Sequence, residues 1–317
     1  MTARLPLVMQ PSGSLIYQLQ TGTPDYFDGA DTFNFLAGGR LTLTSNTPVT
    51  TSDVTSATGT IYYTPYLHDR ISLWNGSRWT TYKFSQLTDT TLSGGAANQI
   101  YDYFIDWNGG SPILSAETGG TSGLWTNNTT RAHSLSVLNG VLVNSGNNAR
   151  YVGSVRLSAN GTLTDSAAQR FVWNYHNRVV RGISNTVTSA HTYGSTTWRE
   201  WNGSTTNIAE FIIGENEDAI NVVLRGDVQL PAVLQEYTAL TGVGLDSTTS
   251  PTVSTGVITP GSTVAASDWL STAGVTIPPA TVSTIGYHYL AALESGSTAG
   301  SNTVTFNSFT IAASLPM

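Results

Sequence analysis

Residues 135–143 read LSVLNGVLV, and this stretch decides the fold class of the chain. At its centre is Asn139-Gly140, a pair that adopts the positive φ angles of a two-residue type I′ turn at the lowest steric cost. Apolar and β-branched residues flank the pair on both sides, which is typical of two paired strands. The sequence therefore predicts a β-hairpin with strands at Leu135–Leu138 and Val141–Val143.

The same kind of turn recurs along the chain. Asn-Gly also occurs at positions 75–76, 108–109, 160–161 and 202–203, and short β-rich runs lie between these turns. We find no long stretch with apolar residues at helical spacing. Many short strands separated by explicit turns predict an all-β chain of tandem antiparallel β-sandwiches, jelly-roll-like, with little or no helix.

Two segments need a separate decision. Tyr287–Glu294 fits either a helix or a strand, and we expect a strand. Thr248–Val264 mixes Thr, Ser, Pro and Gly, and this composition predicts a long loop. Among the more clearly patterned runs, we expect strands at Arg70–Trp74, Tyr101–Trp107, Tyr151–Leu157, Phe171–Tyr175, Ile208–Ile213, Ile220–Leu224 and Val304–Ile311.

The length suggests more than one folding unit. A chain of 317 residues can form a single β-domain, but two domains are the more natural division. The segment Val179–Ser195 follows the dense aromatic run at 170–175 and is poor in aromatic residues, so we place the boundary in this segment. The predicted organisation is an irregular leader over 1–36, a first β-sandwich over 37–180 and a second β-sandwich over 181–317.

Composition excludes several classes of protein. The chain has 13 basic and 20 acidic residues, a net charge of −7 and no cysteine. Disulfides, thiol nucleophiles and cysteine-ligated metals are therefore absent. A net negative chain with scattered arginines is a poor match for a nucleic-acid partner, which requires a clustered basic face. No apolar run approaches about 18 residues, so we expect no membrane insertion.

Motifs for catalysis are missing as well. The sequence contains no G-x-S-x-G, no phosphate-binding loop with lysine and no H-E-x-x-H, and its five histidines lie far apart. We expect no enzymatic activity and no cofactor. Only a depolymerase that uses paired carboxylates remains as an enzymatic alternative.

Carboxylates gather at three places. Asp102 and Asp106 share one face of the strand expected at Tyr101–Trp107, and we expect both to face solvent. Two other acidic groups lack the pattern of a calcium-binding loop, so no metal site is expected there. These two groups are Glu215, Glu217 and Asp218, and Asp25, Asp28 and Asp31.

Tryptophan is the remaining candidate for a binding role. Several of the 8 tryptophans lie at or beside expected turns. Exposed rings can stack on the apolar faces of sugars, whereas a tryptophan that flanks a hairpin more often packs on its cross-strand neighbour. The candidate glycan-stacking residues are Trp74, Trp107, Trp125 and Trp201.

Long strings of sequence, in order, resemble a known family. The chain is similar over 40–317 to a module of tailed-bacteriophage virion structural proteins, of the tail-fibre-like, head-fibre or decoration type. The strings that carry the resemblance are RLTLTSNTPVTTSDV (40–54), IYYTPY (61–66), RISLWNG (70–76), DSAAQRFVWNYHNR (165–178), TWREWNGSTTN (197–207), GVGLDSTT (242–249) and GYHYL (286–290).

The resemblance implies a β-rich protein displayed on the surface of a virion, assembled in the cytoplasm of a bacterial host. It further implies a homotrimer without cofactor, whose other partners are capsid, neck or tail proteins, with the leader 1–36 as a candidate virion anchor. It implies a contribution to host attachment and brings no set of functional residues. The alternative from a different class is a carbohydrate-binding module that recognises a host surface glycan through exposed tryptophans.

Overall fold

The computed structural model describes residues 7–9, 16–18, 34–118, 121–231, 236–259, 267–282, 284–299 and 302–317. These residues form β-strands almost throughout, and the helical segments among them are two single 3-10 turns, η1 (Thr91–Gly94) and η2 (Trp201–Gly203). The all-β prediction is confirmed. Pairing is antiparallel except between β19 (Gln169–Arg170) and β24 (Ile208–Ile213), which are parallel.

A sheet of 14 strands runs through both halves of the chain. Its central path is β10 (Pro112–Ser115), β9 (Ile100–Trp107), β17 (Arg150–Ala159), β18 (Thr162–Asp165), β19, β24, β29 (Gly286–Gly296), β26 (Tyr237–Leu245) and β27 (Val253–Thr259). Beside this path lie β4 (Val54–Thr58), β15 (Leu135–Leu138), β16 (Val141–Asn144), β20 (Val172–Asn174) and β23 (Arg199–Glu200).

A second sheet has six strands and belongs to the C-terminal half. Its order is β21 (Val180–Val187), β31 (Asn302–Pro316), β25 (Ile220–Leu230) and β28 (Ser267–Ile277), with β22 (His191–Tyr193) and β30 (Thr298–Ala299) also paired to β31. The smaller sheets are β3 (Gly39–Thr42), β5 (Ile61–Pro65) and β8 (Leu87–Asp89); β6 (Arg70–Trp74) and β7 (Trp79–Lys83); β11 (Glu117–Thr118) and β12 (Thr121–Ser122); β13 (Trp125–Asn127) and β14 (Thr130–Arg131); and β1 (Leu7–Met9) and β2 (Ile16–Gln18).

The hairpin predicted from residues 135–143 is present. β15 and β16 pair from Leu138 with Val141 outward. The turn residues have the required positive angles, with φ of 51° at Asn139 and 82° at Gly140. The turn chemistry of two residues therefore fixes the register of both strands.

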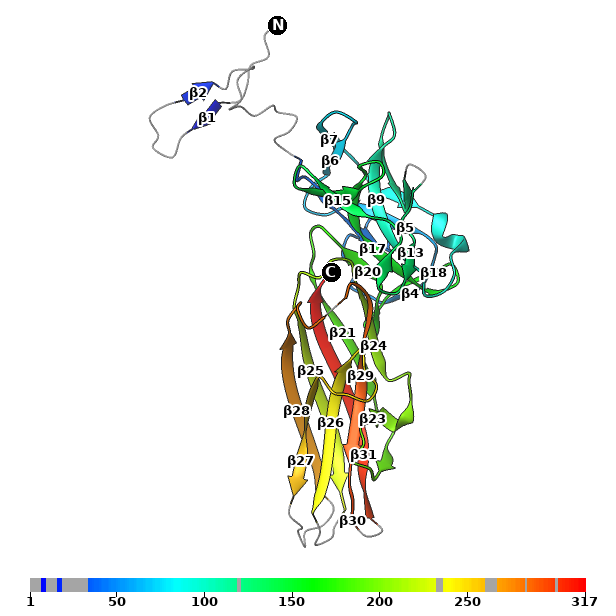
Figure 1. The fold of residues 1–317 in the computed structure, drawn as a ribbon, viewed down its shortest axis with the longest axis vertical. Helices are drawn as coiled ribbons and strands as arrows, with labels where there is room; N and C mark the ends of the chain where they lie inside the picture. Colours follow the sequence, from blue (N-terminus) through cyan, green and yellow to red (C-terminus); the bar gives the residue numbers. More distant parts are fainter. Residues whose placement is uncertain are drawn as a thin grey trace.

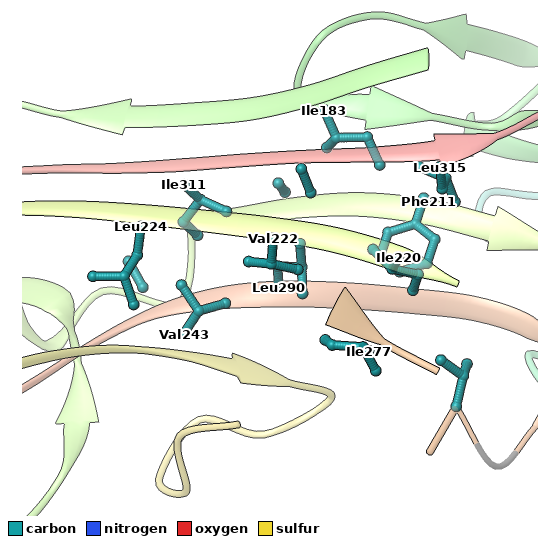
Figure 2. Close-up of a cluster of buried hydrophobic side chains, with 14 of the residues drawn as sticks. Ile183, Phe211, Ile220, Val222, Leu224, Val243, Ile277, Leu290, Ile311 and Leu315 are labelled. Atoms are coloured by element: carbon teal, nitrogen blue, oxygen red, sulfur yellow. The ribbon is translucent and has the colours of Figure 1, made fainter. Parts of the chain in front are cut away.

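The C-terminal half is a two-layer sandwich of long strands. Figure 1 shows these strands running along the long axis of the molecule, with the shorter strands of the N-terminal half gathered at one end. Alternate residues of both sheets point between the layers, and Figure 2 shows Val222, Leu224 and Ile311 of one sheet facing Val243 and Leu290 of the other. Burial of these side chains holds the layers together.

The central strand β9 separates two cores. Ile100 and Phe104 belong to the larger core, which extends into the C-terminal half, and Tyr103 and Ile105 belong to a second core of N-terminal residues. The alternation expected for this strand is confirmed. Both of its faces are covered, however, so neither face is the solvent face that we expected for its carboxylates.

Two further segment predictions have clear outcomes. Tyr287–Glu294 lies within β29, as expected. The long loop expected over Thr248–Val264 is wrong for Val253–Thr259, which is β27 and pairs with β26. A run of Ser, Thr and Gly with alternate apolar residues is compatible with a strand whose partner is supplied by the fold.

The two expected domains share a core and a sheet in the described structure. The larger core contains Phe171 and Trp173 together with Ile183 and Phe211, and the main sheet crosses the expected boundary at 180/181. The domain bounds 37–180 and 181–317 stay a prediction from the sequence, and the shared core and sheet indicate that the two parts unfold together. Within the leader 1–36, only β1, β2 and residues 34–36 are described, and Asp25, Asp28 and Asp31 lie outside the described residues.

Candidate functional site

Trp201 is buried, which contradicts the expected exposed ring. The Asn-Gly turn that follows it folds as η2 against the core instead of extending into solvent. The Trp201 ring has no exposed surface and lies 5.3 Å from Phe306 and 5.0 Å from Phe309, centroid to centroid. It cannot stack on a sugar without unfolding of this region.

Trp125 is also buried, so the prediction of an exposed ring is wrong for this residue as well. Only 4% of the residue is exposed. Its Nε1 donates a hydrogen bond to Asp102 over 3.0 Å, and the guanidinium of Arg131 lies 4.7 Å above its ring. An internal carboxylate and a cation thus hold this indole in the interior.

Trp74 and Trp107 are partly exposed but do not form a common platform. Trp74 lies opposite Trp79 on the β6–β7 hairpin, with the ring centroids 5.9 Å apart. Trp107 stacks on Tyr82 at 3.8 Å. Because Tyr82 is three residues after Trp79 on the same strand, the two pairs lie on opposite faces of the hairpin.

Asp102 is the centre of a buried polar network. This carboxylate is fully buried, and it accepts hydrogen bonds from Arg131 (2.5 Å), His133 (3.0 Å) and Ser154 (2.6 Å) in addition to Trp125. The solvent-facing position expected for Asp102 is wrong because the larger core covers that face of β9. Asp106, four residues along, is half-buried and accepts a hydrogen bond from Asn147.

Arg131 connects this network to the C-terminal half. Besides Asp102, it donates to the carboxylate of Glu215 (2.8 Å) and to the carbonyl oxygen of Gly214 (2.7 Å). It also donates to the Tyr151 hydroxyl over 3.2 Å. One guanidinium therefore joins β14 to the acidic segment after β24.

The electrostatics of the network follow from these contacts. Burial alone would raise the pKa of Asp102, but the hydrogen bond from His133 and the charge of Arg131 hold it below its usual value. Burial lowers the pKa of Arg131, and the nearby Tyr151 and Asp102 more than offset this effect, so the pKa of Arg131 is raised. Asp102 and Arg131 are a buried ion pair.

Each carboxylate of the acidic cluster after β24 is paired with an arginine. Glu215 pairs with Arg131, while Glu217 and Asp218 pair with Arg178 at 2.6 Å and 2.7 Å. Among the residues that the structure describes, no group of three or more His, Asp or Glu side chains could hold a metal ion.

A second buried carboxylate is also held by internal partners. Glu294 on β29 is fully buried, and it pairs with His191 at 2.5 Å and with Arg199 at 2.7 Å. The backbone N–H of Asn202 also donates to it over 3.2 Å. This contact ties the η2 turn to the sheet and keeps Trp201 in place.

Arg150 holds the backbone of residues 34–35 in place. It is buried and donates hydrogen bonds to the carbonyl oxygens of Asn34 (2.5 Å), Phe35 (3.1 Å) and Ser72 (3.0 Å). It also lines a cavity of about 250 Å³ together with His176 and Arg178. Burial, together with the charges of Arg150 and Arg178, holds the pKa of His176 well below its usual value.

Sequence reasoning missed most of these partners. Arg131, His133 and Ser154 are 29, 31 and 52 residues from Asp102. No local spacing connects them. The arrangement also differs from that of a hydrolytic triad, because Ser154 donates to the carboxylate whereas a nucleophilic serine donates to a histidine.

In the described ranges, no helix is long and apolar enough to cross a lipid bilayer.

Comparisons with known proteins give weak likenesses. No protein-family model and no curated protein matches the chain. A structure of infectious bursal disease virus, Gx strain, has a TM-score of 0.29 and 13% identity, covering 83% of this chain and 70% of that chain. The VP2 subviral particle of the same virus has a TM-score of 0.29 and 11% identity over the same shares. The δ-endotoxin Cry8Ea1 of Bacillus thuringiensis has a TM-score of 0.21 and 9% identity, covering 90% of this chain and 54% of that chain. Likenesses of this strength carry no argument about function.

Proposed function

We propose that this chain is a non-enzymatic structural subunit of a bacteriophage virion, of the fibre, spike or decoration type, displayed on the particle surface. The observation that carries the proposal is the long-stranded sandwich. Its longest strand, β31, has 15 residues. At about 3.3 Å per residue such a strand spans roughly 50 Å. Sheets of this length form a stiff rod that can hold one end of the molecule away from the other (Figure 1).

The polar chemistry of the interior supports the same role. Asp102 and Glu294 are fully buried, and both are held by arginine and histidine. Each carboxylate is held by internal partners whose removal would destabilise the fold, and neither is free for acid–base work at a surface. The low share of charged residues, 10%, gives a surface suited to permanent packing against other chains.

The proposed partners follow from the resemblance in sequence. They are two further copies of this chain in a homotrimer and the capsid, neck or tail proteins of the same particle. The proposed location is the virion, after assembly in the bacterial cytoplasm, and the proposed contribution to infection is host attachment.

The test is the protein content of the particle. We expect mass spectrometry of gradient-purified virions of the encoding phage to find this chain at a fixed ratio to the major capsid protein. Labelling with gold-conjugated antibody should place it on the particle surface. Its absence from washed particles, or infective particles that form normally without the gene, would contradict the proposal.

The glycan-binding alternative keeps one candidate surface, the stacked and partly exposed pair of Tyr82 and Trp107. If it holds, saturable binding to a host glycan should disappear in Trp107→Ala while the variant keeps its melting temperature. Trp74→Ala is the matched control, because its ring lies on the other face of the hairpin. Equal binding by all three proteins would remove Trp107 from this role.

A further inference from the structure

The outer face of the six-stranded sheet is exposed or partly exposed at every position from β21 to β28 named below. Its residues are every second position of β21 from Gly182 to Thr186, of β31 from Ser308 to Ser314, of β25 from Asn221 to Asp227 and of β28 from Leu270 to Thr276. Their neighbours in sequence point into the core (Figure 2). None of the face residues is buried. We call this surface the outer face.

Small side chains dominate the outer face. Its central row is Ser184, Ala312, Val223 and Gly274, which lie side by side across the four strands. Such a row has no long side chain to keep another surface at a distance. Two copies of it can approach as closely as the two sheets of a sandwich, about 10 Å.

Two glycines on this face have no explanation within the subunit. At Gly182 a Cβ atom would meet nothing within 4 Å, and at Gly274 it would meet only ordinary contacts at 3.6 Å or more. Neither position has a positive φ. Gly226, which points inward on β25, differs because a Cβ there would lie 2.5 Å from Thr241. Glycine costs stability in a strand and marks places where another backbone approaches closely.

The charges on the outer face are balanced. Its ionisable side chains are Arg225 and Asp227, and neither forms an ion pair with any residue that the structure describes. A second copy can therefore set its own Asp227 against Arg225 without leaving a charge unmatched. Mutual pairing of this kind is a property of self-complementary surfaces, which join two copies about a twofold axis, so this contact is distinct from the threefold contacts of the proposed homotrimer.

The area is sufficient for a specific contact. Strands about 4.8 Å apart, with outward residues about 6.7 Å apart along each strand, give a face of roughly 500 Å². Two copies packed on it bury about 1,000 Å² in total, the minimum that a specific interface has to reach.

We propose that the outer face is the surface on which a second copy of this chain packs in the assembled subunit. The inference rests on the proposed structural function and names the interface that the assembly uses. The outer face combines glycines that have free space beside them, small side chains, and one positive and one negative side chain. A second copy would fill the space beside the glycines, pack closely on the small side chains and supply the opposite charges.

The experiment measures the native mass of the full chain by light scattering after size exclusion. The chain mass is 33.6 kDa. We expect the wild type at two or more times this mass and the Val223→Arg variant at half the mass of the wild type, because a twofold contact joins two equal halves. Ser184→Arg on the neighbouring strand should act in the same way. Val137→Arg is the matched control, because Val137 is also an exposed strand valine but lies on β15, and its mass should equal that of the wild type.

Each outcome decides the inference. Thermal unfolding confirms that the variants are folded before their masses are compared. A wild-type multimer that Val223→Arg and Ser184→Arg leave intact would overturn the assigned face and leave the proposed function standing. A monomeric wild type whose Val223→Arg variant no longer enters virions would also overturn the inference, because the face then belongs to another virion protein. Absence of the wild type from virions contradicts the proposed function alone, whatever the mass.

Discussion

A tryptophan beside an Asn-Gly turn can point to solvent or into the core, and Trp201 points into the core. Truncation of a large, fully buried aromatic side chain typically costs about 3–5 kcal/mol. We expect Trp201→Ala to lower the free energy of unfolding by about this amount, measured by urea denaturation. Trp107→Ala removes a partly exposed ring and should cost clearly less. Equal losses would show that the Trp201 pocket collapses around the smaller side chain.

Asp102 and Arg131 stabilise the fold only as a pair. In Asp102→Asn the guanidinium of Arg131 keeps Glu215 but loses its buried carboxylate partner. Loss of one partner from a buried pair costs about 3–5 kcal/mol. Denaturant unfolding of this variant should show a loss of that size, whereas Asp106→Asn at a half-buried position should stay within about 1 kcal/mol of the wild type. A near-neutral Asp102→Asn would contradict the role of the network.

His176 makes stability depend on pH below neutrality. The folded state holds the pKa of this imidazole well below its usual value, whereas the unfolded chain binds the proton near pH 6.5. The unfolded state therefore binds more protons as the pH falls, and the wild type should lose up to about 1.4 kcal/mol per pH unit below that value. His176→Gln should reduce this slope, measured by denaturation at pH 7.0, 6.0 and 5.0, and His68→Gln should keep it. Parallel slopes in all three proteins would contradict the prediction.

At the scale of the element, the β15–β16 hairpin depends on one backbone angle. Proline fixes φ near −65°, whereas Asn139 has a φ of 51°. Asn139→Pro should therefore lower the free energy of unfolding by more than about 1 kcal/mol, measured as a drop in Tm. Asn139→Gly is the control, because glycine adopts the same angle without strain. An unchanged Tm in Asn139→Pro would mean that the hairpin is dispensable for stability.

The elements that the sequence predicts best are those with local causes. The Asn139-Gly140 turn follows from the steric preferences of two residues, and the alternation of β9 follows from strand geometry. Tyr287–Glu294 was ambiguous in sequence, and pairing with β24 and β26 makes it a strand. The turn and the alternation needed no knowledge of distant residues, whereas the strand at Tyr287–Glu294 depends on partners elsewhere in the chain.

The features that sequence analysis missed depend on distant contacts. Val253–Thr259 has a loop-like composition, and only its partner β26 makes it a strand. Asp102 has the pattern of a solvent-facing carboxylate, and it is buried because the larger core covers that face of β9. Its partner Arg131 has no local signature. Periodicity reports which side chains share a face, but not what covers that face.

At the scale of the whole molecule, the two halves share both a sheet and a core. β19 pairs with β24 across the expected boundary at 180/181, and Arg181 donates to the carbonyl oxygen of Thr50 over 2.6 Å. The Asp102–Arg131–Glu215 contacts add a buried ionic link between the halves. Unfolding of one half would expose apolar surface of the other and break this link.

This coupling predicts a single unfolding transition for the whole chain. Separate domains joined by a small polar interface melt independently, whereas units that share a core melt together. Differential scanning calorimetry should therefore show one peak, with a calorimetric enthalpy close to the van't Hoff enthalpy. Asp102→Asn should shift that peak to lower temperature without splitting it, because the shared core with Phe171, Trp173 and Phe211 remains. Two resolved peaks in the wild type would instead establish 37–180 and 181–317 as independent units, and a split seen only in Asp102→Asn would show that the buried pair, more than the apolar core, makes the molecule cooperative.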